Sequence, residues 1–220
     1  MVIIHTLLSM LGYGDEPYSR HFQDVALDAF AGVLRLNSLD EIIKHHPKHG
    51  AYIEAETPFP CAYHLTALAY TQGWRTPENV QLMARAINHI NEIMPGDLSQ
   101  GIINTFVVKV GSSYGGGLWN LTHPFGIYAN PNPSGNTLFR RHLTELAMLG
   151  VGRHVDVLRV SADNLQEELA EDGVLRIEGY KIPKYAFAYK DIGLEPYPRK
   201  KNAALCDATF WAVQLCTSIL

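Results

Sequence analysis

One pattern occurs three times in this chain: an apolar helical stretch ends at a glycine, and a second helix follows within a few residues. The three apolar stretches and their glycines are Leu7–Leu11 with Gly12, Leu65–Ala69 with Gly73, and Leu143–Ala147 with Gly150. Helices that turn back in this way bury their apolar sides against the next pair, which is typical of stacked helical hairpins. The sequence therefore predicts a mostly α-helical fold.

Apolar residues spaced three and four apart, together with helix start and stop signals, predict seven helices. The expected helices span 2–12, 19–36, 60–72, 77–94, 137–149, 155–170 and 202–220. Alternating or β-branched stretches predict short β insertions near 102–110 and 174–190. The Pro- and His-rich segment 47–60 is predicted to be a loop. We expect a single domain over 1–220.

Composition excludes some partners. The net charge is −4 and the only dense basic run is 199–201, so no nucleic-acid partner is expected. No apolar run approaches the roughly 18 residues that a membrane span requires. The apolar start of the chain lacks a basic flank, and the three cysteines are scattered. These features predict a cytoplasmic protein without a membrane span.

The segment Leu165–Leu175 contains Gln166 and then Asp172-Gly173 at the end of a predicted helix. This segment and the rhythm of the helical hairpins resemble the α/α toroids of terpenoid cyclases and protein prenyltransferases. The resemblance implies a partial toroid in which the first helix of each hairpin lines an apolar cavity. The Asp-x-Asp-Asp and Asp-Asp-x-x-Asp clusters of cyclases and terpene synthases are absent. The resemblance therefore implies no particular reaction, and the cofactor stays unknown.

Three residues are candidates for acid–base chemistry. His64 and His142 each precede the repeated leucine by one position, so we expect them at equivalent places on first-in-hairpin helices. Asp207 lies in the corresponding region of the last predicted helix. Two histidines and one aspartate that face a shared cavity could transfer protons. In the alternative interpretation, each is a hydrogen-bonded polar residue at a helix interface.

Four residues are candidates for ligand binding. Trp119, His123 and Phe125 belong to an aromatic loop that follows Gly115–Gly117, where the backbone could approach a ligand closely. Cys206 lies beside Asp207. The aromatic loop is interpreted as a lid, or alternatively as packing over the helix ends.

Two further groups have simpler interpretations. His45, His46 and His49 include enough imidazoles for a zinc site, but Pro47 interrupts them, and we interpret the segment as an exposed loop, with a zinc site as the alternative. No metal site is assigned. Arg141 and Glu145 are spaced for an ion pair on a helix surface.

Two functions follow from these observations. The first is a prenyltransferase- or cyclase-like protein that holds an apolar, isoprenoid-like ligand in a central cavity. The second is a non-catalytic helical-repeat scaffold that binds another protein or associates with itself through the last predicted helix. The last predicted helix is apolar on several sides and has no returning partner, so we expect a homo-oligomer formed through this helix.

Overall fold

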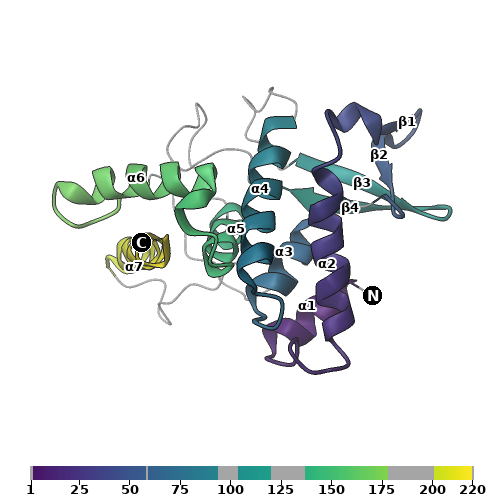
Figure 1. Cartoon of the computed structure of the whole chain (residues 1–220). Coiled ribbons are helices and arrows are strands. Elements are labelled where there is room, and N and C mark those ends of the chain that lie inside the picture. Colours follow the sequence, from purple (N-terminus) through teal and green to yellow (C-terminus); the bar gives the residue numbers. More distant parts are fainter. Residues whose placement is uncertain (1, 58, 94–103, 120–136, 178–200, 220) are drawn as a thin grey trace. The chain divides into compact units, whose positions relative to one another are not determined.

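The computed structural model describes residues 2–57, 59–93, 104–119, 137–177 and 201–219. These residues form seven α-helices and one four-stranded sheet (Figure 1). The helices are α1 (Val2–Met10), α2 (Arg20–Val33), α3 (Ala62–Ala69), α4 (Pro77–Ile93), α5 (Thr137–Met148), α6 (Asp156–Ala170) and α7 (Ala203–Ile219). The prediction of a mostly helical fold is confirmed.

The chain divides into two compact units. Unit 1 contains Met1–Leu98 and Ile102–Thr122, and unit 2 contains Ser99–Gly101 and His123–Leu220. Because a compact unit is not in itself an independent domain, the single domain expected over 1–220 stays a prediction.

The helices of unit 1 follow one another as two helix–turn–helix pairs, α1–α2 and α3–α4, and the two pairs contact each other. Helix α1 packs against α3, and α2 packs against both α3 and α4. The Thr6 hydroxyl donates to the carbonyl of Tyr63, and Asp15 accepts from the N–H of Gln72; each pair is separated by 57 residues. Because the separation is the same for the pair in the helices and for the pair in the turns that follow them, α1 and α3 run in the same direction. The turns after the two helices are therefore also neighbours.

The core of unit 1 lies between these helices. Its fully buried large side chains include Phe30, Leu65, Leu68, Met83, Ile87 and Ile90. They recur at helical spacing on α2, α3 and α4, because each helix turns one apolar side toward the others.

A mixed sheet completes unit 1, in the order β1 (Lys44–His46), β2 (Gly50–Glu54), β3 (Asn104–Val110) and β4 (Ser113–Trp119). Strands β2 and β3 are parallel, and the α3–α4 hairpin connects them. The predicted β insertion at 102–110 corresponds to β3. The predicted loop over 47–60 is wrong in part, because Gly50–Glu54 forms β2 and pairs with β3 across a long stretch of sequence.

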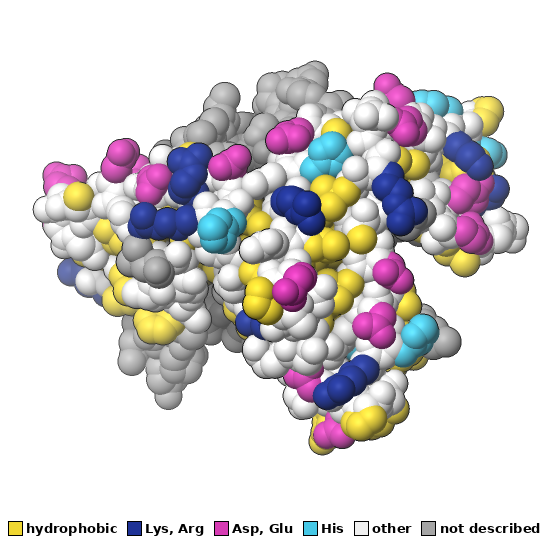
Figure 2. Space-filling view, viewed as in Figure 1, with side chains coloured by type: hydrophobic (Ala, Val, Ile, Leu, Met, Phe, Trp, Pro, Cys, Tyr) yellow, Lys and Arg dark blue, Asp and Glu magenta, His cyan; other side chains and the backbone are white. Residues whose placement is uncertain are grey.

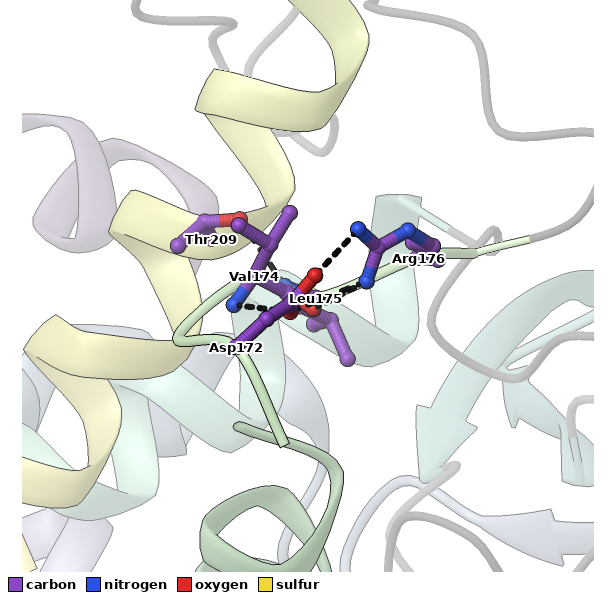
Figure 3. A network of polar contacts seen from close by, with 5 residues as sticks. All are labelled: Asp172, Val174, Leu175, Arg176 and Thr209. Atoms are coloured by element: carbon purple, nitrogen blue, oxygen red, sulfur yellow. Dashed lines mark hydrogen bonds and ion pairs between the residues drawn. The ribbon is translucent and has the colours of Figure 1, made fainter. Parts of the chain in front are cut away.

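Unit 2 contains α5, α6 and α7, which pack against one another. After α6, Asp172 accepts a hydrogen bond from the N–H of Val174 and pairs with Arg176, and the N–H of Leu175 donates to the Thr209 hydroxyl of α7 (Figure 3). The Asp172-Gly173 pair therefore ends α6 and directs the chain onto α7. Residues 174–177 form no strand, and the rest of the second predicted β insertion lies outside the described residues.

Candidate functional site

Polar side chains gather in unit 1 around the first turn of α3, beside α1. Cys61 directly precedes α3, and its backbone N–H donates to Nδ1 of His64 at 3.1 Å. Its sulfur lies 3.6 Å from the same nitrogen. The i, i+3 spacing across the start of a helix places the two side chains together, as in a capping box.

His5 of α1 is the third member of this group. Its side chain is 3% exposed, and its ring lies 4.8 Å from that of Phe22. The backbone of Ser19 hydrogen-bonds the ring, whereas Nε2 has no hydrogen-bond partner. Burial lowers the pKa of His5, and the Ser19 contact only partly offsets this effect.

The group is uncharged at neutral pH. Burial lowers the pKa of His64 to about 4. Repulsion between His64 and a protonated His5 contributes the smaller part of this decrease. Burial raises the pKa of the Cys61 thiol, although backbone hydrogen bonds from His64 and Tyr63 oppose the effect. A reactive cysteine needs a thiolate, which an imidazolium or another cation stabilises. Here the resting pair is a thiol and a neutral imidazole, which suits hydrogen bonding to a ligand or within the helix interface.

The structure places the other predicted acid–base residues in unit 2. Asp207 is 2% exposed on α7, and His142 lies in α5, where its side chain is outside the described residues. Because His64 belongs to unit 1, a cavity shared by His64, His142 and Asp207 stays a prediction.

The predicted ligand-binding residues have different positions. Trp119 is the last residue of β4, and its side chain is not described; His123 and Phe125 lie outside the described residues. Cys206 is exposed on α7. It therefore points to a different side of this helix from the buried Asp207.

Of the three clustered histidines, His45 and His46 belong to β1, and His49 lies in the turn between β1 and β2. The rings of His46 and His49 lie 5.3 and 4.1 Å from that of Tyr114. Within the described part of the chain, no three His, Cys, Asp or Glu side chains form a group that could hold a metal ion.

The predicted pair of Arg141 and Glu145 exists, with Nε and Oε1 2.8 Å apart. The expectation that it lies at the surface is wrong, since the two side chains are 9% and 1% exposed. Unlike charges tolerate such burial when they are paired and hydrogen-bonded.

Sequence reasoning missed the contributions of His5, Cys61 and Asp15. Cys61 and His64 could have been found from their spacing at a helix start, and His5 from its place in an apolar stretch. Nothing in the sequence pairs Asp15 with Gln72.

Comparison of the chain with protein-family models, curated proteins and solved structures found no match. None of the described helices is long and apolar enough to cross a bilayer.

Proposed function

We propose that this chain is a non-catalytic helical-repeat protein that associates with itself through the outer face of α7. One observation carries the proposal: Phe210 and Val213, one turn apart on α7, are 53% and 47% exposed. The other exposed residues of this helix are Cys206, Gln214, Thr217 and Ser218. A second copy could cover this face without burying a charge.

Sedimentation velocity over a range of concentrations tests this proposal. Phe210→Glu puts a charge at the centre of the α7 face while leaving the core of unit 2 unchanged, so we expect it to weaken association at least tenfold. Val110→Glu, which changes a 61% exposed residue at the end of β3, is the matched control. Identical sedimentation of F210E and the natural protein would contradict the proposal.

The second candidate is a prenyltransferase- or cyclase-like protein, in which the leading helices of a partial toroid line a hollow for an isoprenoid-like ligand. It is favoured by the parallel arrangement of α1 and α3, the leading helices of successive hairpins. The uncharged His64 would add a polar group to this hollow without a charge. In this function, His142 and Asp207 would supply the remaining polar groups. A cytoplasmic location is proposed for either function.

Calorimetric titration with farnesol, an uncharged isoprenoid alcohol, tests the second candidate. We expect saturable binding that His64→Ala and Asp207→Ala each weaken about fivefold, because a lost hydrogen bond costs about 1 kcal/mol. Absence of saturable binding would remove the ligand from the proposal, and variants that bind farnesol as tightly as the natural protein would remove these residues.

A further inference from the structure

Helix α1 turns its polar side inward and its apolar side outward. His5, Thr6 and Ser9 are at most 4% exposed. Ile4, Leu7 and Leu11, the last of these one residue beyond the helix, are 65%, 43% and 70% exposed. At about 100° per residue the two sets lie on opposite sides of the helix. This is the reverse of the usual amphipathic arrangement.

The inward side of α1 is fixed by hydrogen bonds. Thr6 donates to the carbonyl of Tyr63 in α3, and Ser9 donates to the carbonyl of His5. Rotating the helix to bury Leu7 would break the contact between Thr6 and α3. The apolar stripe of Ile4, Leu7 and Leu11, here called the α1 stripe, therefore stays outside unless another surface covers it.

The turn that follows α1 also carries large exposed side chains. Figure 2 shows hydrophobic side chains at the surface of the lobe of unit 1 that contains α1 and the turn after it. Tyr13 and Tyr18 in that turn are 52% and 63% exposed, and tyrosine is enriched at protein interfaces.

We propose that the α1 stripe is a second contact surface between copies of this chain, in which two α1 helices pair antiparallel about a two-fold axis at Leu7. The inference rests on the proposed function only in treating the chain as self-associating. In this arrangement Ile4 of each copy meets Leu11 of the other, because the two residues lie three and four positions from Leu7 on the same side.

The lack of Asp, Glu, Lys and Arg in α1 favours a second copy as the occupant. A two-fold contact brings each residue close to its own counterpart, so any charge near the axis would meet a like charge. Val2–Met10 contains no Asp, Glu, Lys or Arg. One short helix from each copy makes a small interface, so we expect dissociation constants in the micromolar range.

The experiment uses the full chain carrying Phe210→Glu, so that the α7 face does not contribute. Sedimentation equilibrium should show dimers of F210E, and adding Leu7→Glu or Leu7→Lys should each weaken dimerisation about 100-fold or more, because like charges meet at the axis. Mixing F210E/L7E with F210E/L7K should restore a mixed dimer. Circular dichroism confirms that each variant is folded.

Three results would overturn the inference: monomeric F210E, undiminished dimers of F210E/L7E, or failure of the two charged variants to associate when mixed. A Val213→Glu variant in the same background is the matched control and should dimerise like F210E. The proposed function is tested separately, by comparing the sedimentation of F210E with that of the natural protein. Its failure can therefore be distinguished from failure of this inference.

Discussion

At the scale of single residues, one carboxylate joins the two hairpins of unit 1. Asp15, in the turn after α1, accepts hydrogen bonds from the N–H groups of Gln72 and Gly73 at 2.8 and 2.7 Å and from the Gln23 side chain at 2.9 Å. Desolvation raises the pKa of Asp15, but these hydrogen bonds and the charge of Arg20 together lower it below its ordinary value. The group is therefore ionised at neutral pH.

Replacing Asp15 by Ala should lower the free energy of unfolding by about 2 kcal/mol, because two backbone donors of the second turn lose a charged acceptor. Asp15→Asn keeps one acceptor oxygen and should cost about half as much. Urea unfolding at pH 7 measures both. An unchanged midpoint for D15A would show that water replaces the carboxylate without cost.

His64 makes stability depend on pH. Its pKa is about 4 in the folded protein and 6.5 ordinarily, so the unfolded chain binds the proton more readily. The free energy of unfolding should therefore fall as pH is lowered from 6.5 to about 4, by up to about 3 kcal/mol from this residue. His64→Gln retains an acceptor for the Cys61 N–H and should remove most of this loss. Urea unfolding of both proteins at pH 7 and pH 4.5 tests the prediction; parallel pH profiles would contradict it.

At the scale of elements, a close approach between turns fixes how α1 lies on α3. A Cβ atom at Gly14 would meet Cγ2 of Thr71 and would lie 2.9 Å from Cα of Ser9. Glycine is therefore required there for lack of space. Gly12 has a φ of +87° and no atom within 4 Å of such a Cβ, so it is required only for its backbone conformation.

Gly14→Ala should lower the free energy of unfolding by about 2 kcal/mol, as expected for overpacking. Thr71→Ser removes Cγ2 but keeps the hydroxyl that donates to the carbonyl of Ala67. The G14A/T71S pair should therefore be at least about 0.5 kcal/mol more stable than the sum of the single changes predicts. Gly12→Ala with T71S is the control and should be additive. Additivity in both pairs would show that the clash is relieved elsewhere.

The helices and strands also show which local sequence signals are sufficient to predict secondary structure. Each predicted helix coincides with an observed one to within a few residues, because Pro77, Gly12 and the three- and four-residue spacing act over a single turn. Strands β1, β2 and β4 were missed. Strands β1 and β2 are three and five residues long, β4 contains three consecutive glycines, and all three depend on pairing with other strands of the sheet. Such pairing is a long-range contact that no local pattern encodes.

At the scale of the whole molecule, association should depend little on attractive charge contacts. The faces proposed for association are uncharged, whereas each chain carries a net charge of −4. On the viewed face, acidic and basic side chains are interspersed (Figure 2). Added salt should screen the repulsion between copies without breaking attractive pairs.

The association constant should therefore stay constant or rise when salt is increased from about 0.05 to about 0.5 M. Sedimentation equilibrium of the natural protein at both concentrations measures it. A fall of tenfold or more would indicate an interface built from ion pairs and would contradict both proposed surfaces.

The sequence by itself determined the helix spans, their turns and the mostly helical fold class, because helix periodicity and capping are local interactions. Only the tertiary structure decided that α1 lies with its polar side against α3, that the Arg141–Glu145 pair is buried, and that Asp15 reaches the next hairpin. Each of these depends on which surface a second element covers. That choice is made by packing between residues far apart in the chain, and the periodicity of one helix does not contain it.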